Sequence, residues 1–276
     1  MFAARPVLTS AATGRTRSLG RSPPRSSRCT TAGPEARFAT EPAPSTTGPR
    51  RRRPPVPARA DGSPGIEGRE RAVVGCVILA AGASTRLGRS KQLLELGGMP
   101  VIRRVCEAAL RAALDDVVVV LGHDAEAVRA ALPDAGLRLR AVRNEHYREG
   151  QSTSLVAGIR TVHPKADAAL VLLGDQPEIR VEAIDAVLAR WRSDGGDIVQ
   201  AAYGGSAAHP MLFDRSMWPE LEAATGDEGA RGIIARHRDQ RVLVEVGGRP
   251  PRDIDTAEDY ERIKASFGSG TGRPAH

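Results

Sequence analysis

LAAGASTRLGRSK, residues 79–91, is a stretch of glycine and other small residues that ends in an arginine and a lysine. It continues from VVGCVILA (73–80), an apolar run typical of a buried strand. Small residues let backbone N–H groups approach an anion closely, and Arg86 and Lys91 add positive charge. The stretch therefore predicts a phosphate-binding loop at the end of the first strand.

The spacing within this loop excludes two common kinds of phosphate site. A P-loop requires GxxxxGK followed by Ser or Thr, whereas five residues separate Gly82 from Gly88 and Lys91 follows three positions later. A dinucleotide fingerprint requires GxGxxG at the start of a helix, a spacing that is not found here. The remaining interpretations are a longer anion-binding loop or a surface turn, and the preceding buried strand favours the loop.

Strand-like apolar runs alternate with helical periods over residues 73–203. We expect strands at 73–80, 116–122, 137–144, 168–177 and 197–203, and helices at 99–114, 123–132, 154–162 and 181–194. Unbroken apolar strands alternating with helices indicate a mostly parallel sheet covered on both faces. The expected fold is one doubly wound α/β domain, Rossmann-like, over residues 72–267. In such folds ligands bind beyond the carboxyl ends of the strands.

The first 60 residues differ in composition from the rest of the chain. They contain twelve arginines, no lysine, ten of the twenty prolines and two acidic residues, Glu35 and Glu41. Such a segment cannot bury enough apolar surface to offset its ordering entropy. We expect a disordered leader at 1–71 and a disordered tail at 268–276. An organelle transit peptide is the alternative for the leader, because it is rich in Arg and Ser and poor in acidic residues.

The charge pattern and the cysteines exclude further classes of function. The basic pI of 10.0 comes from the leader, and no aromatic residues interleave its arginine run at 50–53, so no nucleic-acid partner is expected. The chain lacks a run of about 20 apolar residues, so no membrane span is expected. Cys29, Cys76 and Cys106 share no metal-ligand spacing and are expected to be reduced in a cytoplasmic protein.

Further motifs follow the glycine loop in order along the chain. They are LLELGGMPVI (93–102), NEHYREGQSTSL (144–155), GDQP (174–177), HPMLF (209–213), GDEGAR (226–231) and DIDTAEDY (253–260). Together with residues 79–91 they resemble the MobA-like nucleotidyltransferases, and among these the molybdenum cofactor cytidylyltransferases. The resemblance covers Val74 to Ile263. It departs from the family pattern at Ala208, where glycine is common, and at Ala257, where proline is frequent.

The resemblance implies a reaction and its participants. CMP would be transferred from CTP to molybdopterin with release of pyrophosphate, and Mg²⁺ or Mn²⁺ would be the cofactor. A transient contact with a molybdenum hydroxylase apoenzyme is a further implied partner. Two alternatives stay open: a transferase of the same fold that uses GTP or a sugar or alditol phosphate, and a non-catalytic nucleotide-binding assembly factor for molybdenum hydroxylases.

The resemblance also implies roles for individual residues in nucleotide binding. Arg86 would bind the leaving pyrophosphate, and Lys91 would offset charge at the α-phosphate. The other nucleotide-binding positions are Leu79, Ala80, Ala81, Gly82, Ala83, Ser84, Gln151, Ser152 and Ser154. Alanine at Ala81 goes with cytidine nucleotides in the family. For Ser152 and Ser154 the alternative is capping of the following helix.

Three residues are candidates for metal and acceptor binding. Asp175 and Asp255 would bind the cation, since Mg²⁺ prefers one or two carboxylates with phosphate oxygens and water. Both are expected to follow apolar strands and to meet at the carboxyl edge of the sheet, and each has helix capping as its alternative. His209 would face the second substrate or pack at the start of a strand.

Overall fold

The computed structural model describes Arg69 and residues 71–268 of the 276-residue chain. The predicted leader (1–71) and tail (268–276) lie outside the described residues, except for Arg69, Arg71 and Gly268. Residues 71–268 contain nearly all of the predicted domain, so the fold prediction can be compared with them directly.

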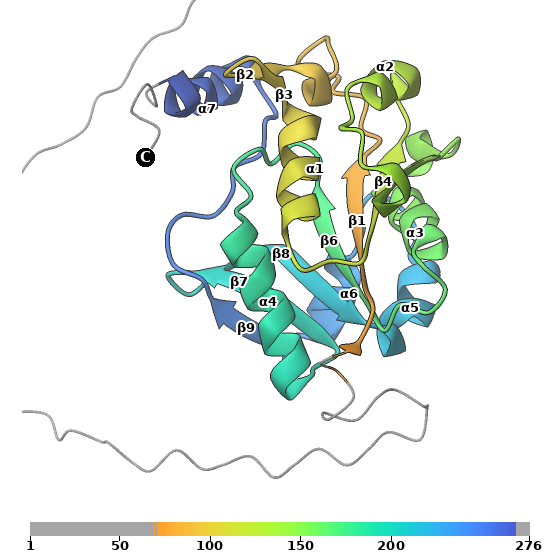
Figure 1. Cartoon of the computed structure of the whole chain (residues 1–276). Helices are drawn as coiled ribbons and strands as arrows, with labels where there is room; N and C mark the ends of the chain where they lie inside the picture. The colour runs from red at the N-terminus through yellow and green to blue at the C-terminus, as the bar shows by residue number, and fades with distance from the viewer. Residues whose placement is uncertain (1–68, 70, 269–276) are drawn as a thin grey trace, which may run out of the picture. The chain divides into compact units, whose positions relative to one another are not determined.

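A seven-stranded sheet runs through the described residues in the order β5-β4-β1-β6-β8-β7-β9 (Figure 1). Its strands are β1 (Val74–Ala80), β4 (Asp116–Leu121), β5 (Leu139–Arg143), β6 (Ala168–Leu173), β7 (Ile198–Tyr203), β8 (Ser206–Asp214) and β9 (Val242–Glu245). All neighbouring pairs are parallel except β6–β8 and β7–β8. The predicted mostly parallel α/β fold is confirmed.

Strand β8 has no counterpart among the expected strands, and it runs antiparallel to both of its neighbours. It follows β7 through a tight turn at Gly204 and Gly205, whose φ angles are 57° and 80°. Two glycines between strands are typical of a two-residue hairpin, because the favoured turns require positive φ. The carboxylate of Glu245 accepts hydrogen bonds from both glycine N–H groups, at 2.6 and 3.0 Å, and so ties the turn to β9.

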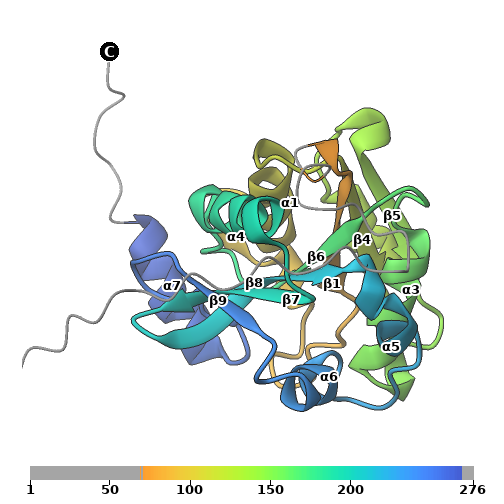
Figure 2. The same cartoon turned by 90° about the horizontal axis from the view of Figure 1, so that it is seen from below.

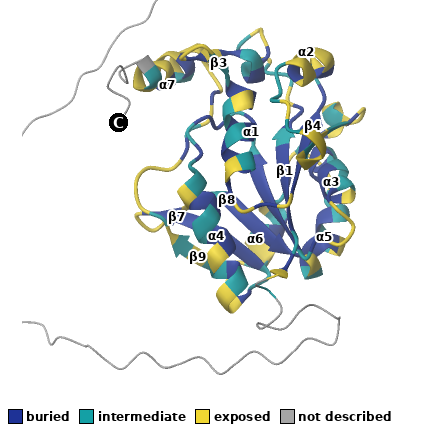
Figure 3. Cartoon of the chain, viewed as in Figure 1, coloured by how far each residue is buried: buried dark blue, intermediate teal, exposed yellow. Residues whose placement is uncertain are grey.

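Helices cover both faces of the sheet (Figure 2). One face packs against α1 (Val101–Arg111), α2 (Ala125–Ala130) and α4 (Val181–Asp194), and the other against α3 (Gln151–Thr161), α5 (Trp218–Glu222) and α6 (Arg231–Arg236). Side chains alternate along β1, so Cys76 and Ile78 join the first core and Val77 the second. Figure 3 shows these central strands buried and the outer helix surfaces exposed.

A short hairpin and the last helix form a third apolar cluster. Strands β2 (Glu95–Leu96) and β3 (Met99–Pro100) form the hairpin, so α1 begins two residues later than the expected 99–114 helix. Helix α7 (Ala257–Gly268) packs on it, and the Tyr260 hydroxyl donates to the Glu95 carbonyl at 2.8 Å. In Figure 1 this cluster lies at the edge toward which β1 and β6 point.

Cys76 and Cys106 are free thiols in the first core. Burial raises the pKa of Cys106 to about 12. The expected core position is confirmed for these two, and Cys29 lies outside the described residues. None of the helices in residues 71–268 has the length and apolar character needed to cross a membrane.

Candidate functional site

The glycine loop leaves β1 after Leu79 and Ala80 and runs to the short 3-10 turn Lys91–Leu93. From Gly82 to Arg86, no backbone N–H donates a hydrogen bond to any group in the described part of the chain. A Cβ placed on Gly82 would meet no atom within 4 Å, so the space beside this glycine is open. Consecutive N–H donors without a protein acceptor are suited to bind an anion.

Ser84 folds the loop back toward its own end. It adopts a left-handed conformation with φ of 50°, and its carbonyl accepts a hydrogen bond from the Leu87 N–H at 3.0 Å. Its hydroxyl accepts another from the Lys91 N–H at 3.0 Å. The backbone of Lys91 is therefore fixed to the middle of the loop.

The Lys91 ammonium lies between two carboxylates. Nζ contacts Oδ2 of Asp175 and lies 3.1 Å from Oδ1 of Asp255, and the nearest Arg86 nitrogen is 3.9 Å from the other Asp255 oxygen. The side chains of Lys91 and Asp175 are only 15% and 14% exposed, whereas those of Asp255 and Arg86 are 49% and 74% exposed. The structure thus brings together Arg86, Lys91, Asp175 and Asp255.

The charges of the buried pair shift each other's pKa. Burial raises the pKa of Asp175, the Lys91 ammonium opposes this, and the nearby Asp253 carboxylate adds to the rise, so the net pKa is raised. Burial lowers the pKa of Lys91, but the two carboxylates outweigh it and the net pKa is raised. Lys91 is therefore a cation at neutral pH.

Asp255 reaches the site on a segment that lies along the GDQP turn. The Ile254 N–H donates to the Asp175 carbonyl at 3.2 Å, and the Gln176 side-chain amide donates to Asp253 at 2.9 Å. Asp255 was expected to follow an apolar strand, and β9 does precede it, but residues 246–256 between β9 and α7 contain neither strand nor helix. Contacts with the GDQP turn hold this segment in place.

An ion pair between Arg252 and Glu178 continues these contacts. The guanidinium forks onto both carboxylate oxygens at 2.8 and 2.6 Å, and this hydrogen bonding lowers the pKa of Glu178. The sequence analysis missed Gln176, Glu178, Arg252 and Asp253. The second aspartate of the DID triplet was assigned, and the first could have been found from the same motif.

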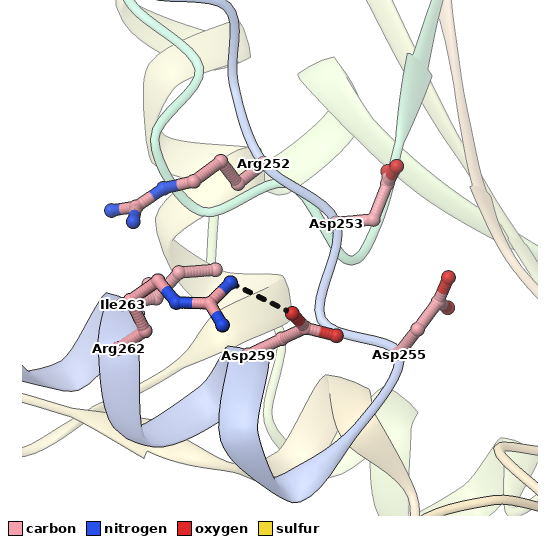
Figure 4. A pocket seen from close by; sticks show the side chains of 6 residues that line it. All are labelled: Arg252, Asp253, Asp255, Asp259, Arg262 and Ile263. Atoms are coloured by element: carbon pink, nitrogen blue, oxygen red, sulfur yellow. Dashed lines mark hydrogen bonds and ion pairs between the residues drawn. The ribbon is translucent and has the colours of Figure 1, made fainter. Parts of the chain in front are cut away.

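Beside Asp255 lies a polar pocket of about 340 Å³ (Figure 4). Its lining residues are Arg252, Asp253, Asp255, Asp259, Arg262 and Ile263. Figure 4 shows Arg262 paired with Asp259, at 3.3 Å, and Arg252 is held by Glu178. Because both guanidiniums already have carboxylate partners, the pocket carries no free positive charge for a phosphate.

The two carboxylates fit a hard divalent cation. Both contact one ammonium group, which shows that their oxygens converge on a single positive charge. Neither caps a helix: α4 begins at Val181 with Arg180 at its N-cap, and Thr256 caps α7. Residues 71–268 contain no group of three or more His, Cys, Asp or Glu placed to hold a metal. Two carboxylates with phosphate oxygens and water are a set that Mg²⁺ accepts.

His209 lies on β8 close to the end of β6. The register pairs Met211 with Val171, so His209 stands at the carboxyl edge, close enough to Asp175 and Arg231 for their charges to act on its ring. Burial, with a smaller effect from Arg231, lowers the pKa of His209 to about 4 despite the opposing Asp175 charge. At neutral pH the imidazole is uncharged and can contribute hydrogen bonds but no positive charge.

Ser152 and Ser154 are buried near the start of α3, and protein groups engage both hydroxyls. Ser152 donates to the Thr225 carbonyl at 3.0 Å, and Ser154 accepts from the Asn144 amide at 2.9 Å. Gly150 occupies the N-cap position of α3. In the described structure the two serines therefore hold neighbouring segments together, and Asn144 is a buried residue that the sequence analysis missed.

Gln151 lies where the GDEGAR loop crosses the start of α3. A Cβ on Gly229 would lie 3.0 Å from the Gln151 amide oxygen, and one on Gly150 would lie 2.3 Å from the Gly226 carbonyl oxygen. The two segments therefore touch through backbone, and any side chain at residue 150 would separate them. This contact places the GDEGAR loop next to the candidate nucleotide site.

Ala81 is buried against the end of β4. A Cβ on Gly122 would lie 2.7 Å from the Ala81 carbonyl oxygen and 2.8 Å from the Ala81 methyl group, so only glycine fits there. The His123 N–H donates to the Ala81 carbonyl at 3.2 Å, and Tyr147 packs on the other side of Gly122. Residue 81 thus lies in a closely packed part of the site.

Comparison with known proteins identifies the family of this fold and site. Residues 76–242 match the model described as a MobA-like NTP transferase domain. The chain belongs to the MobA-like NTP transferase family. It is therefore a member of the nucleotidyltransferases.

Two curated relatives and one solved structure extend the comparison. The MobA-like chain is 34% identical over 199 residues to nicotine blue oxidoreductase of Paenarthrobacter nicotinovorans, covering 68% of this chain and 94% of the relative. It is 28% identical to purine catabolism protein PucB of Bacillus subtilis, covering 69% and 96%. The structure of Rv0371c from Mycobacterium tuberculosis complexed with manganese superposes with a TM-score of 0.61 at 30% identity, covering 71% of this chain and all of that one.

Proposed function

We propose that this MobA-like protein is a cytoplasmic CTP:molybdopterin cytidylyltransferase that uses Mg²⁺ or Mn²⁺. It transfers CMP from CTP to the phosphate of molybdopterin and releases pyrophosphate. The observation that carries the proposal is the position of Lys91 between Asp175 and Asp255, directly beside a loop of unpaired N–H donors.

The chemistry requires charge neutralisation and no protein nucleophile. An acceptor phosphate oxygen attacks the α-phosphorus in line, and the bond to the leaving pyrophosphate breaks. The N–H groups of residues 82–86 hold the triphosphate, Arg86 binds the leaving portion, and Lys91 stabilises charge at the α-phosphate. A divalent cation held by Asp175 and Asp255 would supply further neutralisation of the phosphate oxygens.

His209 would bind the acceptor substrate. Its neutral imidazole stands beside Asp175 at the carboxyl edge, where it can hydrogen-bond a polar acceptor without adding charge. Residues 208–209 lie on β8, which neighbours β6, the strand that GDQP follows. A cofactor-assembly role implies transient contact with a molybdenum hydroxylase apoenzyme, to which the product would be delivered.

A second candidate comes from the nicotine blue oxidoreductase relative, whose name describes a redox activity on a closely similar chain. The glycine loop of the present chain lacks the GxGxxG spacing of dinucleotide sites. Its carboxylate pair serves phosphate chemistry more directly than hydride transfer, so nucleotidyl transfer is preferred.

One assay tests the proposal against its alternatives. Pyrophosphate release is measured with each of the four ribonucleoside triphosphates, with and without molybdopterin, in Mg²⁺ or Mn²⁺. The proposal expects release that depends on CTP, molybdopterin and metal together. Release with GTP or with a sugar or alditol phosphate would favour another transferase, and no release from any mixture would favour a binding factor. Oxidation of reduced nicotinamide cofactor by the protein would favour the redox function.

A further inference from the structure

Lys91 occupies the place between the two carboxylates that a bound cation would take. Its ammonium contacts one oxygen of Asp175 and one of Asp255. A metal ligated by these carboxylates needs direct contact with the same oxygens, because Mg²⁺ and similar ions bind oxygen at about 2.0–2.1 Å. The ammonium and a divalent ion repel each other and cannot share that place.

The ion pair that a metal would have to break is shielded from solvent. The side chains of Lys91 and Asp175 are only 15% and 14% exposed. Surface ion pairs contribute little, but removing one partner from a largely buried pair leaves an uncompensated charge in a medium of low dielectric constant. Displacing Lys91 is therefore unfavourable unless its ammonium finds another anion.

The glycine loop is the place where that anion would arrive. The Lys91 backbone N–H donates to the Ser84 hydroxyl, so the lysine begins beside the middle of the loop. The formal charges of Arg86, Lys91, Asp175 and Asp255 sum to zero, so these four residues offer a free divalent cation no net attraction. A triphosphate supplies both the new partner for Lys91 and the remaining metal ligands.

We propose that Lys91 makes the carboxylate pair selective for a metal–triphosphate complex over the free divalent cation. This inference rests on the proposed nucleotidyl-transfer function and adds a specificity-determining role for Lys91. The ammonium keeps the two carboxylates close together and closed to metal until phosphate oxygens draw it away. Metal and nucleotide therefore bind with strong positive coupling.

The test is a titration of the full-length protein with Mn²⁺ alone. The electron paramagnetic resonance signal of the free ion measures how much Mn²⁺ stays unbound. Lys91→Met is expected to bind Mn²⁺ more tightly than wild type by about tenfold or more, within the range of ordinary site-to-site coupling. Lys91→Gln serves as a second variant of different polarity, and thermal unfolding checks that each is folded. Lys165→Met is the matched control, since it removes a lysine charge from the loop before β6, at the opposite edge of the sheet.

A further variant locates the tighter Mn²⁺ site. Adding Asp175→Asn to Lys91→Met is expected to abolish the gain. Equal or weaker Mn²⁺ binding by both Lys91 variants would overturn the proposal, as would a gain that persists in the double variant or appears equally in Lys165→Met. The proposed function fails separately, if wild type releases no pyrophosphate from any triphosphate, because the Mn²⁺ titration needs no turnover.

Discussion

Thr256 and Asp259 form reciprocal hydrogen bonds that cap the first turn of α7. The Thr256 N–H and hydroxyl donate to one Asp259 oxygen at 3.0 and 2.7 Å, and the Asp259 N–H donates back to the Thr256 hydroxyl at 3.1 Å. This reciprocal arrangement is a capping box. Because Thr256 fills the cap position, the Asp255 carboxylate is left to contact Lys91 and Arg86.

Asp175→Asn and Asp255→Asn are expected to keep the fold and to lose the chemical step. Each change preserves shape and removes a charge, so metal-dependent pyrophosphate release should fall by about 10²- to 10⁴-fold, the scale for loss of one electrostatic element of a site. If the two residues acted as helix caps, Asn would replace them almost silently. Wild-type rates in both variants would therefore refute the metal assignment.

Thr256→Ala is expected to give the opposite result to Asp255→Asn. Losing the cap should lower the free energy of unfolding by about 1 kcal/mol, since two hydrogen bonds at the start of α7 depend on its hydroxyl. Pyrophosphate release at a temperature well below the melting transition should stay close to wild type. Chemical denaturation and the release assay measure the two effects, and an unchanged unfolding free energy would argue against the capping box.

Ala81→Gly is expected to relax the preference for CTP over GTP. The Ala81 methyl group packs against Gly122, and removing it opens space where the first strand ends. The measurement is the ratio of kcat/KM for the two nucleotides in both proteins. A ratio that does not change would show that base selection lies elsewhere in the site, and a wild type that prefers GTP would contradict the assignment to CTP.

His209 is expected to make the protein less stable as the pH falls from about 6.5 to about 4. Its folded pKa of about 4 lies below the ordinary 6.5, so between these values the unfolded chain binds a proton that the folded chain rejects. The free energy of unfolding then falls by up to about 1.4 kcal/mol per pH unit. His209→Gln should remove this slope.

The measured quantity is the free energy of unfolding of wild type minus that of His209→Gln, compared between pH 7.5 and pH 5. Subtracting the two free energies cancels the pH effects of groups that residue 209 does not influence. Urea denaturation at the two pH values gives the four free energies. Identical pH dependence in wild type and His209→Gln would contradict the lowered pKa.

Arg69 is expected to contribute to the stability of the folded domain. It lies over the Trp191 ring at 5.0 Å and pairs with Asp214 at 3.5 Å, and its side chain is 12% exposed. Removing residues 1–68 should leave the melting temperature unchanged. Arg69→Ala in the full chain should lower the free energy of unfolding by about 1–2 kcal/mol, the size of a desolvated cation–π contact. Equal stability of wild type and Arg69→Ala would exclude this role.

The parts of the fold predicted from sequence are those with a long, clear period. Helix α4 was placed at its observed bounds, 181–194, and β1 and β4 within one residue at each end. Strands β8 and β9 and helices α5 and α6 were missed. The two helices have five and six residues, too few for a helical period to show. The Gly204–Gly205 turn was a usable signal for the hairpin that was not applied.

The candidate site also contains residues that the sequence predicted and residues that it did not. The glycine loop, Lys91, Asp175 and Asp255 came from short motifs, and the structure brings their side chains together. The Arg252–Glu178 ion pair and the Gln176–Asp253 hydrogen bond were missed. They join segments 74 and 77 residues apart, and no local periodicity encodes such a pairing. Their existence depends on how the chain returns after β9.

The segment after β9 determines how long a fragment must be to keep the candidate site. The family match ends at residue 242, before the segment that runs along the GDQP turn. A chain ended there would keep Lys91 and Asp175 but would lose Asp255, and without α7 it would also uncover Leu94 and Leu96. An expression fragment that retains both carboxylates and stays soluble therefore has to extend through α7, to Gly268.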